Sequence, residues 1–164
     1  MCGIVGYVGL GFDPDGNKFD HNAYDVVLEG LRRQEYRGYD SAGVALVCPD
    51  GIEFRKKAGK LLNLENEVTE HPLPESQIGI GHTRWATHGG PTDVNAHPHV
   101  VDNGRLAVVH NGIIENFAEL RAELLAEGVE FTSQTDTEVA AATIASIYNK
   151  LGTGDLTEAV RIAS

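Results

Sequence analysis

A short, unbroken apolar run at residues 44–47, inside the stretch AGVALVCPDGIEFRKKAG, restricts the fold more than any other feature of the chain. Pro49, Asp50 and Gly51 follow it, and Pro and Gly at such places favour a tight turn. A strand with one face in water alternates apolar and polar residues, whereas this run does not alternate. We therefore expect a hairpin over residues 42–59, in a sheet that is covered on both faces.

The first forty residues predict a strand, a loop and a helix. CGIVGYVG, residues 2–9, is typical of a strand, and GLGFDPDGNKFD, residues 9–20, of a loop rich in Gly, Pro and Asp. Either Asp20 or Asn22 is placed to cap a following helix. That helix is indicated by apolar residues at i, i+3, i+4 and i+7, namely Tyr24, Val27, Leu28 and Leu31.

The rest of the chain continues this alternation of short apolar runs and helices. QIGIGHTRWATHGG, residues 77–90, and GRLAVVHNG, residues 104–112, are further short apolar runs that end in polar, Gly-bearing segments. A helix is expected before Gly128, and a longer one over residues 137–151. The marker residues are Phe117, Leu120 and Leu124 for the first helix and Ala140, Ile144, Ile147, Tyr148 and Leu151 for the second. We expect one domain over residues 1–164, an α+β layered sandwich.

The composition of the chain disfavours several classes of binding partner. The chain has 164 residues, 41% of them hydrophobic, and a net charge of −11, which disfavours binding to nucleic acid or to an anionic membrane. It has neither a secretory signal nor an apolar stretch near the ~18 residues that a membrane span needs. With two cysteines and no C-x-x-C, we expect a cytoplasmic protein with reduced thiols.

The two cysteines differ in position. Cys48 lies in an apolar strand, where a free cysteine usually packs as a small hydrophobic residue. Cys2 follows the initiator methionine directly. If Met1 is removed, Cys2 carries both a thiol and an α-amine, and such an amine, with an ordinary pKa of about 7.7–8.0, can act as a general base near neutral pH. Cys2 is therefore a candidate nucleophile.

Three other segments offer groups suited to acyl transfer. HNGIIEN contains Asn111 and Gly112, whose side-chain amide and backbone N–H can stabilise an oxyanion, although Asn-Gly is also a common turn. In HTRWATHGG, Arg84 offers a guanidinium fork for a carboxylate, next to Thr87 and His88. Asp136 is placed either to cap a helix or to hold an ammonium group as an exposed carboxylate. Together these groups indicate an α-amino acid with a cleavable side-chain amide, as in glutamine.

Six motifs resemble those of a known family, in order along the chain. They are CGIVGYVG, EYRGYDSAG, GHTRWATHG, NAHPH, HNGIIEN and TDTEV. This set is similar to the glutaminase domain of the isomerising glutamine–fructose-6-phosphate aminotransferases, which are class II glutamine amidotransferases. The resemblance implies an N-terminal-nucleophile (Ntn) hydrolase fold, in which two antiparallel sheets pack between helical layers in an αββα arrangement.

The resemblance also implies a role for each matching residue. Cys2 would be the nucleophile, Asn111 and Gly112 would form the oxyanion hole, and Trp85 would lie on a loop that shields the site. The two ends of glutamine would be held by Arg84, Thr87 and His88 at the carboxylate and by Asp136 at the amine, with Arg37 and Asp40 in support. No metal or cofactor is implied. Fructose 6-phosphate would enter only through sugar-isomerase domains, and a homo-oligomer is expected.

Alternatives remain open at this point. The family's glutaminase domain is longer than 164 residues, so the chain is expected to be its N-terminal part, truncated inside a helix at DLTEAVRIAS, with the isomerase domains absent. It would then be an active glutaminase, an inactive folded fragment, or a domain of the phosphoribosylpyrophosphate amidotransferase type. A metal-binding protein is a further alternative, whereas we expect the clustered histidines to hydrogen-bond loops around the site. They are His82, His88, His97, His99 and His110.

Overall fold

The computed structural model describes residues 2–9 and 21–164. Met1, most of the expected first loop and the alternative cap Asp20 lie outside these residues. The strands are β1 (Gly3–Val8), β2 (Ser41–Cys48), β3 (Gly51–Ala58), β4 (Ile78–Arg84), β5 (His99–Val101) and β6 (Leu106–Val108). The helices are α1 (Ala23–Arg32), the short 3₁₀ helix η1 (Glu35–Arg37), α2 (Leu61–Glu70), α3 (Phe117–Ala126), α4 (Asp136–Leu151) and α5 (Leu156–Ala163).

The strands form two antiparallel sheets. The larger has four strands in the order β1-β4-β2-β3, and β5 and β6 form a two-stranded sheet. The predicted hairpin is confirmed, since β2 and β3 pair along their whole length from Ser41↔Ala58 to Cys48↔Gly51. The first strand pairs with β4, about 75 residues later in the chain, and β4 in turn pairs with β2.

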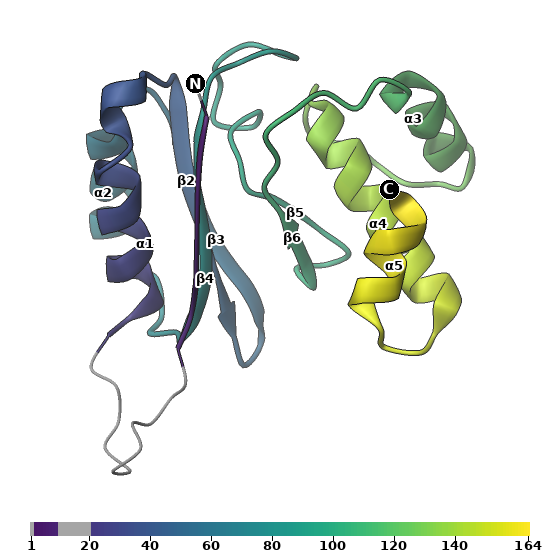
Figure 1. Ribbon diagram of the computed structural model, residues 1–164, viewed down its shortest axis with the longest axis horizontal. Coiled ribbons are helices and arrows are strands. Elements are labelled where there is room, and N and C mark those ends of the chain that lie inside the picture. Colours follow the sequence, from purple (N-terminus) through teal and green to yellow (C-terminus); the bar gives the residue numbers. More distant parts are fainter. Residues whose placement is uncertain (1, 10–20) are drawn as a thin grey trace.

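Helices cover both sides of the structure (Figure 1). The α1 and α2 helices lie against one face of the large sheet, and the β5–β6 hairpin lies on its other side, followed by α3, α4 and α5. This arrangement confirms the expected layered sandwich. Val44, Ala45 and Leu46 are buried, as the unbroken apolar run predicts, whereas Val47 near the hairpin turn is 50% exposed. The main apolar core lies between α1, α2 and the large sheet.

Polar side chains cap the N-terminal ends of α1 and α4. The Asn22 side chain accepts a hydrogen bond from the backbone N–H of Tyr24, so it caps α1 as predicted. The prediction of Asp136 as the cap of α4 is wrong, because Thr135 takes this position and its hydroxyl accepts from Glu138 N–H. Thr135 has an extended backbone suited to a cap, which makes Asp136 the first helical residue. The Asp136 carboxylate is thereby available for other contacts.

Helices α4 and α5 leave apolar side chains on an open side. The residues that α4 buries are small and polar ones of its first turns together with Val139, Ala141, Ala142 and Ala145. On the predicted side, Ala140 and the larger Ile144 and Ile147 are half-buried and line a groove of about 890 Å³. In α5, Ala159 is buried, whereas Leu156 and Val160 are exposed. Within the described ranges, none of the helices combines the length and the apolar character that crossing a membrane requires.

Candidate active site

A pocket of about 470 Å³ brings together most of the residues that the sequence singled out. It lies where the start of β1, the end of β4, the segment before α3 and the first turn of α4 meet. The predicted residues that line it are Cys2, Arg37, Arg84, Trp85, Thr87, Asn111, Gly112 and Asp136. His88 and Asp40 are not among its lining residues, and their contacts with neighbouring groups are described below.

Cys2 lies half-buried at the start of β1 and faces the end of β4. Its Sγ accepts a hydrogen bond from the backbone N–H of Trp85 over 3.2 Å and lies 3.7 Å from the carbonyl oxygen of the same residue. The Trp85 side chain is 55% exposed at the edge of the pocket. Cys48 is at the far end of β2 and is half-buried rather than fully enclosed, and burial raises the pKa of its thiol. Only Cys2 therefore has its thiol in this pocket.

Asn111 has one side of its amide fixed by a histidine. Its Oδ1 lies 2.8 Å from Nε2 of His82, and because an amide oxygen only accepts, the imidazole nitrogen must donate. Its Nδ2 lies 3.5 Å from the backbone oxygen of Cys2. Burial lowers the pKa of His82 to about 4, so the ring is neutral at physiological pH and keeps one acceptor and one donor.

Histidines form a stacked group beside the pocket. The rings of His82 and His97 stack at 4.3 Å, and His97 meets His99 edge to face at 4.8 Å. His99 lies 2.8 Å from the Thr135 hydroxyl, and Nδ1 of His97 accepts from His110 N–H over 3.4 Å. These contacts agree with histidines that hold loops around the site. Across the residues that the structure describes, no three His, Cys, Asp or Glu side chains are arranged to hold a metal.

Five further residues line the pocket, namely His82, His97, His110, Ile113 and Thr137. The sequence predicts the three histidines only as residues that hydrogen-bond loops around the site, and it does not indicate Ile113 or Thr137. One of them carried a usable signal. His82 precedes Arg84 by two positions in a strand, so both side chains point to the same face. His97 reaches the pocket through a loop contact between distant segments, and the local sequence does not predict its stacking on His82.

Arg84 is buried and holds the segment that follows β4. It is 4% exposed, and its guanidinium donates to the carbonyl oxygens of His88, Gly89 and Gly90. Burial lowers the pKa of Arg84, an effect that nearby Asp40, Cys2 and Asp136 oppose. His88 thus meets Arg84 through its backbone, and its ring packs edge to face on Phe117 at 5.1 Å.

Asp40 supports the segment that carries Trp85. Its Oδ2 accepts from Ala86 N–H over 2.6 Å, and its own N–H donates to the Arg84 carbonyl over 2.7 Å. The residue therefore fastens the chain on both sides of Trp85, whose N–H contacts the Cys2 sulfur. Arg37, at the end of η1, lines the pocket directly.

Asp136 is 4% exposed, so the expectation of an exposed carboxylate is wrong. Its Oδ2 accepts from Ile114 N–H over 2.8 Å, and its Oδ1 from Thr137 N–H over 3.0 Å. These bonds tie the first turn of α4 to the segment that follows Asn111 and Gly112. The carboxylate and the guanidinium of Arg84 thus supply one anionic and one cationic group to the same pocket.

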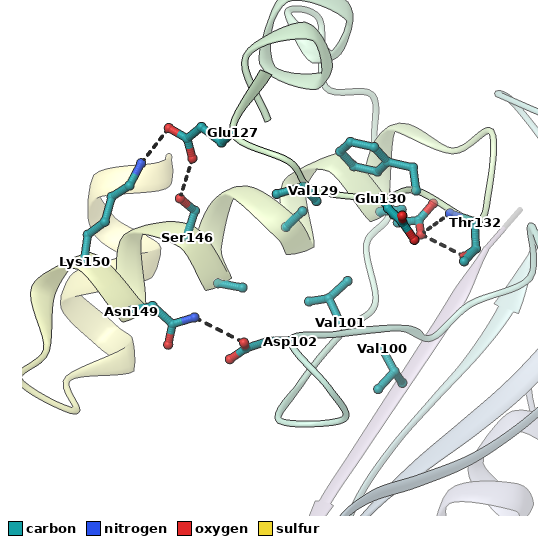
Figure 2. Close-up of a pocket in the computed structure, with 14 residues that line it drawn as sticks. Val100, Val101, Asp102, Glu127, Val129, Glu130, Thr132, Ser146, Asn149 and Lys150 are labelled. Carbon is teal, nitrogen blue, oxygen red and sulfur yellow. Dashed lines mark hydrogen bonds and ion pairs between the residues drawn. The ribbon is translucent and has the colours of Figure 1, made fainter. Parts of the chain in front are cut away.

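A different pocket, of about 560 Å³, lies between β5, residues 127–132 and α4 (Figure 2). None of the predicted site residues lines it. Its polar side chains pair with one another, as in Lys150 with Glu127 and Asn149 with Asp102. Glu138, at one end, accepts from Thr132 and Ser133, and these hydrogen bonds lower its pKa against the effect of burial.

Two antiparallel sheets between helical layers, with a cysteine at the start of the first strand, define the Ntn hydrolase class of folds. Within this class, the family model described as "Glutamine amidotransferase domain" matches residues 68–160 of the chain. The matched segment is more than half of the chain, and the chain belongs to this family.

The most similar curated relatives include proteins named glutamine–fructose-6-phosphate aminotransferase (isomerizing). The protein of Corynebacterium glutamicum is 65% identical over 162 residues, which cover 99% of this chain and 25% of the relative. Those of Streptomyces coelicolor and Thermus thermophilus are 59% and 53% identical, again over 99% of this chain and 24% of each relative. The chain therefore spans about a quarter of the length of the curated relatives it matches.

Solved structures confirm the fold. A glutamine phosphoribosylpyrophosphate amidotransferase from B. subtilis, complexed with ADP and GMP, superimposes with a TM-score of 0.73 at 24% identity and is matched over 99% of this chain and 32% of its own. A structure described as the allosteric regulatory enzyme of purine biosynthesis gives a TM-score of 0.72 at 25% identity, with the same coverage.

Proposed function

We propose that this chain hydrolyses glutamine to glutamate and ammonia, with Cys2 as the nucleophile once Met1 is removed. One observation carries the proposal. The Cys2 thiol shares a pocket with the amide of Asn111, the guanidinium of Arg84 and the carboxylate of Asp136. These are a nucleophile, an oxyanion donor, and one group for each charged end of an α-amino acid.

The two ends of glutamine are held by opposite charges. Arg84, with Thr87 and His88 on the segment that it organises, binds the α-carboxylate, and Asp136 binds the α-ammonium group. Because both charged groups are buried, their attraction for the substrate is screened little by water. This places the side-chain amide of glutamine next to Cys2.

The thiol of Cys2 attacks the amide carbon, and the α-amine of the same residue takes its proton. The carbonyl oxygen becomes an oxyanion, which accepts hydrogen bonds from Asn111 Nδ2 and from the backbone N–H of Gly112. Breaking the carbon–nitrogen bond releases ammonia, with the transferred proton on the leaving nitrogen. Water then hydrolyses the γ-glutamyl thioester, which gives glutamate and restores the thiol.

The chain is proposed to be the N-terminal part, residues 1–164, of a glutaminase domain in a longer polypeptide. The names and lengths of the curated relatives support this, since the chain matches about a quarter of each. In that polypeptide the ammonia passes to sugar-isomerase domains, which convert fructose 6-phosphate into glucosamine 6-phosphate, while Trp85 shields the site. A cytoplasmic location, which keeps the thiol reduced, and a homo-oligomer belong to the same proposal.

The test is ammonia release from glutamine, together with labelling by a glutamine diazoketone. We expect the reagent to modify Cys2, and we expect added glutamine to compete with the reagent and reduce this labelling. Cys2→Ala abolishes both labelling and ammonia release, and the matched variant Cys48→Ala changes neither. Mass spectrometry of the N-terminus establishes whether Met1 has been removed in the tested protein. Labelling at Cys48 alone, or turnover by Cys2→Ala, contradicts the proposal.

A further inference from the structure

Lys56, Gly43 and His82 lie in one row across three neighbouring strands. Gly43 of β2 is directly opposite Lys56 of β3 on one side and directly opposite His82 of β4 on the other. Directly opposite residues point to the same face of an antiparallel sheet, and adjacent strands are about 4.8 Å apart. Lys56 and His82 are therefore on the same face as each other, separated by a residue without a side chain.

The gap over Gly43 is filled by the loop that carries His97. A Cβ built on Gly43 would lie 2.1 Å from the His97 carbonyl oxygen and 2.7 Å from Cβ of Lys56. The loop backbone thus rests directly on the sheet between Lys56 and His82. In this position the His97 ring stacks on His82 at 4.3 Å.

Lys56 fastens this loop from the other side. Its Nζ donates to the carbonyl oxygens of Val94, Ala96 and Pro98, at 3.0, 2.8 and 3.3 Å. An ammonium group has three N–H donors, so the charged form matches the three acceptors. These carbonyls flank His97 on both sides along the chain.

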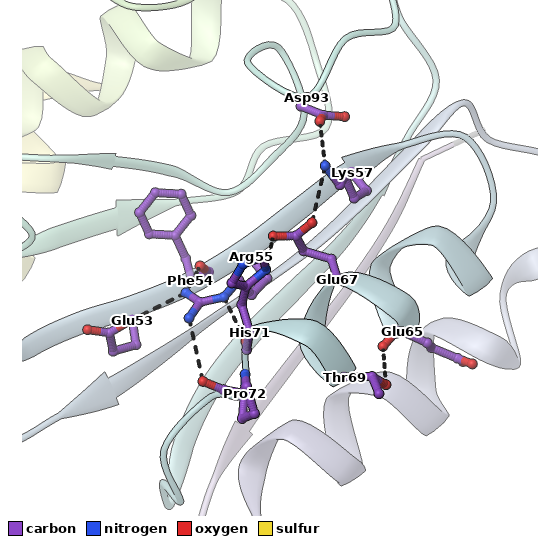
Figure 3. Close-up of polar contacts among 10 residues, drawn as sticks. All are labelled: Glu53, Phe54, Arg55, Lys57, Glu65, Glu67, Thr69, His71, Pro72 and Asp93. Atoms are coloured by element: carbon purple, nitrogen blue, oxygen red, sulfur yellow. Dashed lines mark hydrogen bonds and ion pairs between the residues drawn. The ribbon is translucent and has the colours of Figure 1, made fainter.

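The neighbouring lysine holds the start of the same loop on the opposite face of β3. Lys57 forms ion pairs with Asp93 at 3.0 Å and with Glu67 of α2 at 3.1 Å, and Figure 3 shows it between these two carboxylates. Asp93 also accepts from Ala58 N–H over 2.8 Å. This ion pair is partly exposed and reaches the loop only at Asp93, whereas the three hydrogen bonds of Lys56 reach the carbonyls next to His97.

We propose that Lys56 is a positioning residue for the oxyanion hole: it fixes the 94–98 loop, which sets the His97 ring against His82 and so fixes the amide of Asn111. The assignment rests on the proposed function in one respect, namely that Asn111 stabilises an oxyanion. Each link is a direct contact, from Lys56 to the loop carbonyls, from His97 to His82, and from His82 to Asn111 Oδ1. Lys56 itself does not line the pocket.

The surroundings of Lys56 lower the pKa of its ammonium group but leave it charged near neutral pH. Burial lowers its pKa to about 8, and Arg84 on β4 adds to this, whereas Glu138 on α4 and Asp93 oppose it. The adjacent rings of His97 and His99 are neutral, since burial and the charge of Lys56 lower the pKa of both. The ammonium form with its full set of donors therefore dominates near neutral pH.

The first test needs no catalysis. Side-chain amide signals of Asn111 are recorded by ¹⁵N NMR in the wild-type chain, Lys56→Met, Lys56→Arg and the matched control Lys60→Met, whose lysine is exposed. We expect Lys56→Met to shift the Asn111 signals away from their wild-type positions. Lys56→Arg, which keeps several donors, should leave them much closer to the wild-type positions, and Lys60→Met should leave them unchanged. An Asn111 signal that does not respond to Lys56→Met in a folded protein overturns the proposal.

The second test is glutamine hydrolysis. Because Lys56 acts on the oxyanion donor rather than on the groups that bind the substrate ends, Lys56→Met is expected to lower kcat about 10- to 100-fold with KM within about two-fold. Lys56→Arg should recover kcat to within about three-fold. If Lys56→Met instead raises KM about 10- to 100-fold and leaves kcat unchanged, the positioning role is overturned. If the wild type does not hydrolyse glutamine, the proposed function fails. The NMR result still decides whether Lys56 fixes the amide of Asn111.

Discussion

The imidazole of His82 donates a hydrogen bond from Nε2 to Oδ1 of Asn111 over 2.8 Å. Because the two sides of an amide are chemically opposite, this bond decides which side of Asn111 offers donors to the pocket. The remaining Nδ2 lies on the side of Cys2. A buried histidine thus determines the polarity of the proposed oxyanion hole.

His82→Ala tests this relationship. Loss of the donor frees the Asn111 amide to turn, and we expect kcat for glutamine hydrolysis to fall about 10- to 100-fold, less than the loss for removing an oxyanion donor outright. His82→Gln supplies an N–H at a similar place and should recover part of the rate. Steady-state kinetics measure both variants. Equal rates for His82→Ala and the wild type would show that Asn111 keeps its orientation without the histidine.

Acid should destabilise the protein before its carboxylates titrate. Burial lowers the pKa of His82 to about 4 and of His99 to about 3, and lowers that of His97 as well. The unfolded chain binds protons on these rings below about pH 6.5, whereas the folded chain does not, so stability is lost as pH falls. For three such groups the free energy of unfolding should drop by about 4–6 kcal/mol between about pH 7 and 5.

Urea unfolding at several pH values measures this loss. His99→Gln removes one of the three groups and should reduce the slope of stability against pH by about a third. The control is His71→Gln, since His71 is an exposed residue paired with Glu67. A slope that His99→Gln leaves unchanged would contradict the account.

Features decided by neighbouring residues could be predicted from the sequence. The β2–β3 hairpin follows from one apolar run and one turn, and the start of α1 follows from Asn22. The segments that supply Cys2, Arg84 and Asn111 are predictable because each places reactive groups beside glycines or at a chain end. The prediction of Asp136 as a cap fails because the preceding residue, Thr135, is also a good cap, and the Asp136 carboxylate finds partners at Ile114 and Thr137 instead.

Features that depend on pairing between distant strands could not be predicted. The row of Lys56, Gly43 and His82 exists only because β2 lies between β3 and β4 in the sheet. Nothing in the local sequence around Lys56 distinguishes it from Lys57, although Lys56 donates to three carbonyls of the 94–98 loop and Lys57 forms ion pairs with Asp93 and Glu67.

Asp40→Ala should impair the proposed site from outside the pocket. The carboxylate holds Ala86 N–H at 2.6 Å, and a hydrogen bond to a charged group contributes about 1.5–3 kcal/mol. Its loss loosens the segment whose Trp85 N–H contacts Cys2, and kcat/KM is expected to fall about 10- to 150-fold. Asp40→Asn retains an acceptor and should lose less. Asp50→Ala, in the β2–β3 turn, is the matched control and should match the wild type in the same assay.

Arg84→Lys is expected to raise KM for glutamine despite keeping the charge. A lysine cannot hold the carbonyls of residues 88–90 and a substrate carboxylate together as a guanidinium fork can. The loss is expected to be about 1.5–3 kcal/mol in binding. Isothermal titration with glutamine on Cys2→Ala protein measures binding without turnover. Arg33→Lys, at an exposed ion pair with Glu29, serves as the control. An unchanged dissociation constant for Arg84→Lys would remove Arg84 from substrate binding.

Gly43→Ala should destabilise the fold through the His97 loop. The added Cβ would lie 2.1 Å from a backbone oxygen, and a loop that is bonded at three carbonyls to Lys56 has little freedom to withdraw. Overpacking of this kind costs about 1–3 kcal/mol, which urea unfolding detects. Gly6→Ala is the matched control in β1, because a Cβ added there would meet no atom within 4 Å beyond its chain neighbours, and the stability of this variant should stay near that of the wild type. If Gly43→Ala is as stable as Gly6→Ala, the loop does not rest firmly on β2, and the link between Lys56 and His82 through His97 is loose. A loss of stability confined to Gly43→Ala, with a shift of the Asn111 amide signals, is the result that the close packing predicts.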